Sequence, residues 1–259
     1  MYQLLFTLFS YSLGPVTPKI TYFPRFSEET GSWEEIITNM HFPFDEERNI
    51  FLQQDGFLDK ELKPAASISE KERPINQHWS WDRILRSCFI KQADVLQGLY
   101  FLEENYDTET IKRNYDFYEP MTLHESSLSA CVHSILASRI GNIKMAYELY
   151  LRTARLDLDD YNNEVSDGLH ITSMAGTWLA VVEGFGGMRI MSDRVVLNPL
   201  IPEQWKSYSF HARFREILFR VKVTGRSIEI ENLSDERLGL TVFEKNYEIR
   251  GSEILTVKI

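Results

Sequence analysis

Two short polar clusters stand where the sequence pattern changes to an apolar, helix-like run. The first is Glu125-Ser126-Ser127, which opens a stretch that we expect to be helical over about residues 125–139. Serine hydroxyls at a helix start either cap free backbone N–H groups or, together with those groups, hold an anion. The sequence alone favours capping slightly and leaves the anion site open.

The second cluster surrounds His170, with Thr172 and Ser173 close behind it. Gly168 and Gly176 flank this cluster and allow the backbone to approach a ligand or a neighbouring helix. His170 can donate a hydrogen bond to a phosphate oxygen just before the helix begins, although a single histidine of this kind is more often a hydrogen-bonded core residue. Two such helix starts in one helical domain favour a shared anion site.

A third candidate is the pair Lys91 and Gln92, within an apolar run that we expect to form one long buried helix over residues 79–105. Lysine is rarely buried without a partner, so its ammonium group must reach solvent, a carboxylate or a ligand. Snorkelling along the helix surface is the alternative. An ammonium beside an amide suits the hydroxyls of a sugar, and Trp79 and Trp81 are either an aromatic platform for it or part of the core.

The composition restricts what these sites can bind. The 259-residue chain has a formal charge of -10, which disfavours nucleic acid and anionic membranes, because polyanions are attracted by clustered Lys and Arg. A small neutral or anionic ligand is compatible with this charge if local donors surround it. The apolar residues 1–13 have no basic residue before Lys19 and no cleavage pattern, so we expect a piece of core helix in a cytoplasmic protein.

The two cysteines, Cys88 and Cys131, fall in segments that we expect to be buried helix. Their spacing is that of neither a metal site nor a disulfide scaffold. We therefore expect two free core thiols, no bound metal and a reducing compartment.

Helical patterns fill the middle of the chain, and alternating strand patterns fill its last quarter. The expected helices lie at about residues 79–105, 108–117, 125–139, 143–156 and 172–185, and the expected strands at 194–197, 209–214, 217–223, 227–231, 238–243 and 254–259. This order indicates an α+β multidomain chain, a helical domain and then an antiparallel sheet domain. The helices have apolar surface on several sides, so we expect partner helices upstream or on another chain.

Several long ordered motifs carry a resemblance to a known family. They read FPFDEERNIFLQQDGFLDKEL, RPINQHWSWDRILRSCFIKQADVLQGLY, FYEPMTLHESSLS and RTARLDLDDYNNEVSDGLHITSMAGTWLAVVEGFGGMR. From about Trp33 to its end, the chain resembles the carboxy-terminal half of glycoside hydrolase family 65. The resemblance implies that residues 33–190 are the later part of an (α/α)6 catalytic barrel and that residues 194–259 form a small antiparallel β-sandwich. Residues 1–32 do not match the family's pattern, and we expect them to be irregular.

The resemblance also implies roles for single residues. Lys91 and Gln92 would contact the glucosyl unit whose bond is cleaved. The phosphate pocket would consist of Ser126, Ser127, His170, Thr172 and Ser173. The implied ligands are a disaccharide and, as co-substrate, inorganic phosphate, with no organic cofactor and no metal, in a protein that is a homodimer at full length.

The reaction implied by the resemblance is inverting phosphorolysis of maltose to β-D-glucose 1-phosphate and glucose. One carboxylic acid protonates the glycosidic oxygen while phosphate attacks the anomeric carbon from the opposite face. The family's acid is a Glu upstream of the position of Trp33, and Glu28 and Glu29, the carboxylates before that position, do not stand in its motif. We therefore expect a carboxy-terminal fragment that lacks the general acid.

Two alternatives stay open at this point. One is a phosphorylase or hydrolase of another glucobiose, such as trehalose or kojibiose. A hydrolase needs a general base, for which Glu125 is the best-placed carboxylate. The other is a catalytically inactive sugar-binding fragment, which the missing acid motif favours.

Overall fold

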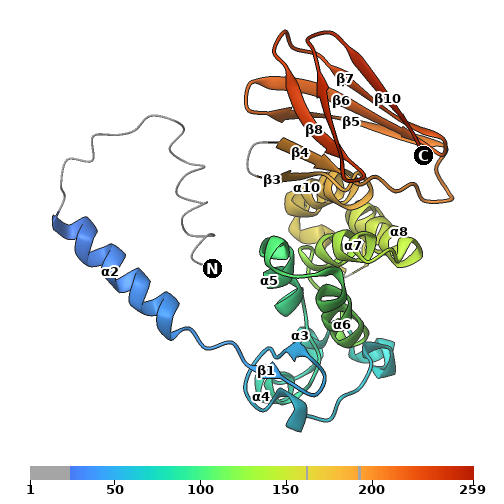
Figure 1. Ribbon diagram of the computed structural model, residues 1–259. Helices are drawn as coiled ribbons and strands as arrows, with labels where there is room; N and C mark the ends of the chain where they lie inside the picture. Colours follow the sequence, from blue (N-terminus) through green and yellow to red (C-terminus); the bar gives the residue numbers. More distant parts are fainter. Residues whose placement is uncertain (1–23, 162, 192–193) are drawn as a thin grey trace.

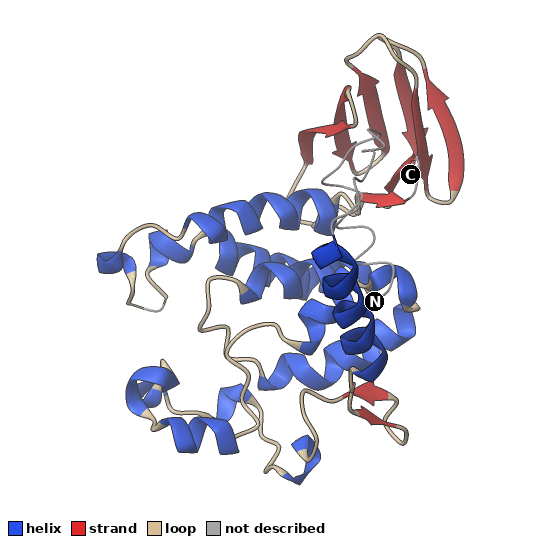
Figure 2. Cartoon of the chain, turned by 90° about the vertical axis from the view of Figure 1, so that its left-hand side faces the viewer, coloured by secondary structure: helices blue, strands red, loops and turns tan. Residues whose placement is uncertain are grey.

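Helices form the first part of the structure and two β-sheets form the second (Figures 1 and 2). The computed structural model describes residues 24–161, 163–191 and 194–259. The core helix expected at residues 1–13 lies outside these ranges. Within them, no helix has the length and apolar character needed to cross a membrane.

The helical region is centred on α7, in which every residue from Ser129 to Ser138 is buried. Its neighbours in space are α5, α6, α8, α10 and the π-helical segment. The helices are α2 (Pro24–Asn39), α3 (Ile75–His78), α4 (Trp81–Arg86), α5 (Val95–Phe101), α6 (Thr108–Tyr118), α7 (Ser129–Arg139), α8 (Ile143–Ala154), α9 (Leu156–Asp159), α10 (Ile171–Leu179) and the π-helical Ala180–Phe185, with a small hairpin of β1 (Phe44–Asp45) and β2 (Ile50–Phe51) after α2. A helix such as α7 needs covering on all sides, and these elements supply it.

The long helix expected over residues 79–105 is not formed. The chain makes α4, leaves the helical conformation at Ser87 and becomes helical again at Val95. Between them, Ile90 N donates to Met121 O (3.1 Å) and Leu123 N donates to Ile90 O (2.8 Å). These backbone bonds to a distant segment compete with helical ones and prevail, so an apolar run that looks helical becomes an extended segment.

Two further expectations need correction at the helix ends. Residues 24–32, expected to be irregular, belong to α2, which stands apart from the other helices in Figure 1. The helix expected from residue 125 begins only at Ser129. The prediction of two free core thiols is confirmed, since Cys88 and Cys131 are both buried and unpaired, but Cys88 lies in the extended segment rather than in a helix.

The two sheets have four strands each, in the orders β10-β7-β6-β5 and β3-β4-β8-β9. All six predicted strands are present, and β3 and β9 are additional. Their bounds are β3 (Arg189–Met191), β4 (Arg194–Leu197), β5 (Ser207–Phe214), β6 (Ile217–Thr224), β7 (Ser227–Asn232), β8 (Leu238–Val242), β9 (Lys245–Ile249) and β10 (Ile254–Lys258).

One apolar cluster lies between the sheets and draws on both of them. In β6 every second residue is buried, as expected of a strand with one face on a core. The pairing is not purely antiparallel as predicted, because β4 pairs with β8 in parallel, Val195 opposite Leu240. The chain leaves β4, builds β5, β6 and β7 of the other sheet, and returns in the same direction as β4.

The helical region passes into the first sheet through Gly186 and Gly187. Gly187 has φ of +55°, and a Cβ on it would lie 2.4 Å from the carbonyl oxygen of Asn198. Only glycine fits both the backbone conformation and this approach. The π-helical segment ends at Phe185 and β3 begins at Arg189, so the chain passes from helix to sheet within residues 186–188.

Candidate active-site pocket

A pocket of about 480 Å³ brings together residues that are far apart in the sequence. Its lining includes Lys91 and Gln92 from the extended segment and Glu125, Ser126 and Ser127 from the turn before α7. Ser126 Oγ donates to Gln92 Oε1 at 3.0 Å, so the predicted sugar-binding pair and the predicted phosphate-binding serines are in direct contact. The contact between these two groups of residues is the main feature of the site that the sequence does not predict.

Lys91 reaches the pocket in a different way from the one expected. Both Lys91 and Gln92 are exposed, and they are carried by a bend in the non-helical backbone rather than by a buried helix. The bridge between Ile90 and Thr122 fixes this backbone beside the segment that leads to the serines. The ammonium group of Lys91 therefore needs no buried partner, and within the described ranges it makes no hydrogen bond or ion pair, so it can meet a ligand. Trp81, a candidate platform, is 74% exposed and does not line the pocket.

The turn before the serines depends on His124, which has φ of 53°. This left-handed conformation is unfavourable for a residue with a side chain, so other contacts must hold it. His124 Nδ1 pairs with Ser129 Oγ at 2.9 Å and Nε2 pairs with Glu119 Oε1 at 3.2 Å. The carbonyl oxygen of His124 accepts from Arg152 at 2.8 Å. The two ring nitrogens and the carbonyl oxygen of His124 thus each make a hydrogen bond that stabilises the backbone before Ser126.

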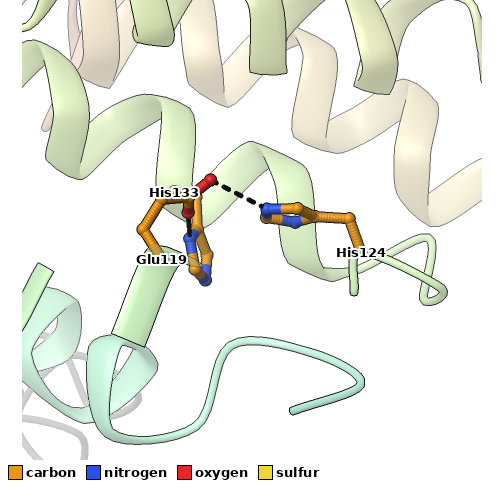
Figure 3. A group of neighbouring side chains, drawn as sticks. All are labelled: Glu119, His124 and His133. Atoms are coloured by element: carbon orange, nitrogen blue, oxygen red, sulfur yellow. Dashed lines mark hydrogen bonds and ion pairs between the residues drawn. The ribbon is translucent and has the colours of Figure 1, made fainter. Parts of the chain in front are cut away.

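Figure 3 shows that Glu119 joins two imidazole rings, one at each carboxylate oxygen, because His133 Nδ1 bonds its other oxygen. Candidate ligand atoms of Glu119, His124 and His133 lie within 4.8 Å of one another, the range in which a metal could be held. Each carboxylate oxygen is already paired with its own ring nitrogen, however. The arrangement is that of a hydrogen-bond network that shapes the turn.

Burial and hydrogen bonding together decide the charge of this network. Burial lowers the pKa of His124 to about 4, so the ring is neutral near pH 7. Burial raises the pKa of Glu119, but the hydrogen bonds from His124 and His133 outweigh it and bring that pKa to about 2. The group at the centre of the network is therefore an ionised carboxylate.

Glu125 is a buried carboxyl group in the pocket wall. Its Oε2 accepts from Ile75 N at 2.9 Å, and its Oε1 has no hydrogen-bond partner in the part of the chain that the structure describes. Burial raises its pKa, although the backbone bond and the nearby charges of Arg73, Lys91 and Arg152 oppose the shift. A carboxyl group in such a position can take up or release a proton near a ligand.

The three residues of the second predicted cluster lie in three different environments. His170 stands at the start of α10, and its Nε2 is 3.7 Å from Glu164 Oε2, a residue of the pocket lining. Thr172 is exposed on α10. Ser173 is buried, and its hydroxyl donates to the Thr153 carbonyl at 3.0 Å, so it joins α10 to α8. Of these three residues, His170 is the one next to the pocket.

Sequence reasoning missed Asp157 and Glu164, which adjoin His170 in space. Asp157 is 13 residues away in the chain and lies in an acidic, helix-like stretch. Both Asp157 and Glu164 belong to the segment DLDDYNNEV, and its acidic residues before a histidine are the one signal in the sequence that could have indicated them.

Comparison with known proteins agrees with these features. The model of the "Glycosyl hydrolase family 65 central catalytic domain" matches residues 19–179, and that of the family's "C-terminal domain" matches residues 188–249. The chain belongs to glycoside hydrolase family 65. The first match begins upstream of Trp33, where the resemblance in the sequence motifs begins. The gap between the two matches contains Gly186 and Gly187, at which the helical region passes into the first sheet.

Relatives within family 65 include enzymes named for different disaccharides. The chain is 50% identical over 219 residues to a maltose phosphorylase of Bacillus subtilis, covering 85% of this chain and 29% of that protein. It is 40% identical over 227 residues to an α,α-trehalose phosphorylase of Thermoanaerobacter brockii, covering 88% and 29%. Among solved structures it matches a putative kojibiose phosphorylase from the human microbiome with a TM-score of 0.82 and 38% identity, covering 90% of this chain and 31% of that one. The chain spans less than a third of each of these relatives.

Proposed function

We propose that this chain carries the phosphate-binding part and part of the sugar-binding site of an inverting maltose phosphorylase. The observation that supports this most is the contact of Ser126 with Gln92 in one pocket that Lys91 also lines. In this proposal the helices are the later part of an (α/α)6 barrel and the sheets are a β-sandwich. The exposed apolar side chains of Ile171, Met174 and Trp178 on α10 are consistent with a helix that further barrel helices would cover.

The proposed reaction places phosphate where an inverting hydrolase holds its base-activated water. Ser126 and Ser127, with His170 from the side of Glu164, hold the phosphate by hydrogen bonds. Lys91 and Gln92 orient the hydroxyls of the glucosyl unit. Phosphate attacks the anomeric carbon while a carboxylic acid protonates the leaving oxygen, so the products are β-D-glucose 1-phosphate and glucose. The reaction requires no organic cofactor and no metal, and we place it in the cytoplasm, in a protein that is a homodimer at full length.

The disaccharide is the least constrained part of the proposal. The relatives named for trehalose and kojibiose make phosphorolysis of another glucobiose the second candidate. Hydrolysis is a third, because the buried carboxyl group of Glu125 lines the pocket and is the group that could activate water. A catalytically inactive sugar-binding role would need the same pocket.

We expect no phosphorolysis of maltose by this chain alone. Residues 1–32 do not contain the motif that the resemblance implies for the acid, and without that proton the glucose departs as a poor anionic leaving group. The measurement is release of glucose 1-phosphate from maltose and phosphate, with the Bacillus subtilis maltose phosphorylase as a positive control. Product formed at a rate similar to that of the control would show that a carboxylate of this chain supplies the acid.

Replacing His170 by Ala is expected to weaken phosphate binding by roughly ten- to a hundredfold, since a lost hydrogen bond to a charged group is worth about 1.5–3 kcal/mol. Isothermal titration of the chain with inorganic phosphate measures this effect. Replacing Lys91 by Ala should weaken maltose binding and leave phosphate binding nearly unchanged.

The matched control is His78→Ala, an exposed histidine of α3 that does not line the pocket. It should leave both affinities unchanged. If the unmodified chain and the His170→Ala chain took up phosphate equally while the variant melted several degrees lower, His170 would be a structural histidine. The phosphate site would then have to lie elsewhere.

A further inference from the structure

We propose that Asp157 is the positioning residue of the phosphate site, holding His170 so that its Nε2 is the ring atom that meets the anion. The inference rests on the proposed function, because it assigns a role to a neighbour of His170. Asp157 Oδ1 is 2.6 Å from His170 Nδ1, and its Oδ2 accepts from the His170 backbone N at 2.9 Å. One carboxylate thus binds the ring and the backbone of the same residue.

The direction of the hydrogen bond follows from the charge of Asp157. The hydrogen bonds from the His170 ring and backbone lower the pKa of Asp157, so its carboxylate is ionised and can only accept. Nδ1 must therefore carry a proton in the Asp157 contact. The other ring nitrogen, Nε2, does not contact Asp157 and lies on the opposite edge of the ring, 3.7 Å from Glu164 Oε2.

The two contacts together restrict how the His170 side chain can turn. Rotation about either side-chain bond would separate Nδ1 from Oδ1, while the backbone bond keeps Asp157 in place. The side chains of His170 and Asp157 are only 23% and 13% exposed, so there is little room for another rotamer. The imidazole is pre-organised, and a ligand gains affinity when its partner need not be ordered on binding.

The fixed orientation points Nε2 to the pocket side. Glu164 Oε2 lies 3.7 Å from Nε2, and Glu164 belongs to the pocket lining, whereas Asp157 does not. With the ring proton on Nδ1, Nε2 accepts a hydrogen bond from a P–OH group of hydrogen phosphate in the pocket. Asp157 touches neither ligand and acts only through His170.

The competing explanation is that Asp157 only caps α10. Its bond to the His170 backbone N satisfies one of the free N–H groups that every helix start leaves. A cap stabilises the helix but has no effect on which ring nitrogen is protonated. Identifying the protonated ring nitrogen of His170 therefore distinguishes the two roles of Asp157.

The experiment compares Asp157→Asn with Asp159→Asn, a second aspartate of α9 that pairs with Arg155 and Tyr161. Phosphate affinity is measured by titration calorimetry, and the protonated ring nitrogen of His170 is identified by ¹H–¹⁵N spectroscopy. We expect Asp157→Asn to weaken phosphate binding about tenfold, within the range for a hydrogen bond to a charged group, and to remove the preference for a proton on Nδ1. Asp159→Asn should change neither, and maltose affinity should be the same in both.

Three results would overturn the inference or distinguish it from the proposed function. A neutral His170 ring protonated on Nε2 in the unmodified chain would overturn it without any variant. Wild-type phosphate affinity in Asp157→Asn, with only a lower melting temperature, would leave Asp157 as a cap. If His170→Ala also kept the phosphate affinity of the unmodified chain, the proposed function itself would fail. If His170→Ala lost phosphate affinity and Asp157→Asn kept it, only the role of Asp157 would be excluded.

Discussion

Replacing Gly187 by Ala is expected to lower the free energy of unfolding by roughly 2–5 kcal/mol. About 1–2 kcal/mol arises from placing a side chain at positive φ and about 1–3 kcal/mol from overpacking. The overpacking is severe because the new Cβ would stand 2.4 Å from Asn198 O and 2.7 Å from Asn198 C, which are backbone atoms and cannot rotate away. Either the end of the π-helical segment or the segment after β4 must shift.

Gly141→Ala is the matched control for this variant. Gly141 has φ of +79° but open space around its missing Cβ, so only the conformational part of the cost should appear. Urea unfolding of the two variants and the unmodified chain gives the comparison. Equal destabilisation by both substitutions would mean that the backbone around Gly187 and Asn198 moves apart without loss of stability. Gly187 would then be required only for its positive φ.

Acidification is expected to destabilise the fold through His124 at a higher pH than that at which Glu119 is affected. In the folded chain the pKa of His124 is about 4, against an ordinary value of 6.5. Between those values the unfolded chain binds a proton that the folded chain does not, so stability falls as the pH decreases through 6.5 and continues to fall to about 4. From pH 6.5 to 4.5 the loss is about 2–3 kcal/mol, at 1.36 kcal/mol for each pKa unit.

Glu119 extends the same loss to lower pH. Its pKa of about 2 in the folded chain lies below the ordinary 4.5, so stability is present above pH 4.5 and is lost as the pH falls towards 2. The two windows follow one another because the ordinary pKa of histidine, 6.5, lies above that of glutamate, 4.5, and both values are lowered in the folded chain. Measurements above pH 4.5 therefore separate the titration of His124 from that of Glu119.

The test is the free energy of unfolding of the unmodified chain and of His124→Asn between pH 7 and pH 4.5. Asparagine tolerates the left-handed conformation and does not titrate, so the variant should be less stable at pH 7 but should lose about 2–3 kcal/mol less on acidification. His211→Asn, at an exposed position, should follow the unmodified chain. Parallel pH curves for the unmodified chain and His124→Asn would contradict the assigned pKa of His124.

The strands were predictable where one face of a strand is buried and the other is not. The alternation in β6 and β7 is complete, and both were located to within one residue. β9 was missed because Ile249 is its single buried residue, so its sequence carries little alternation. β3 is only three residues long. The parallel pairing of β4 with β8 depends on contacts between segments more than 40 residues apart, and no local pattern specifies it.

The candidate site was predictable as a set of residue types but not as a geometry. The apolar residues around Lys91 are real core residues, such as Cys88, Ile90 and Leu96, yet they pack from extended as well as helical backbone. Ser173 has the same residue type as Ser126 but faces the Thr153 carbonyl in the core. Asp157 was missed because its meaning depends on His170, which only the fold brings to it.

The place of β4 in its sheet determines the order in which the second domain can assemble during synthesis. β4 has β3 on one side, but its other neighbour, β8, ends at Val242. Until that residue has left the ribosome, Val195 and Leu197 lack the partners that bury them in the finished fold. The sheet that contains β4 therefore cannot be completed before β8 is made, and a chain released early would expose the apolar side chains that make nascent proteins aggregate.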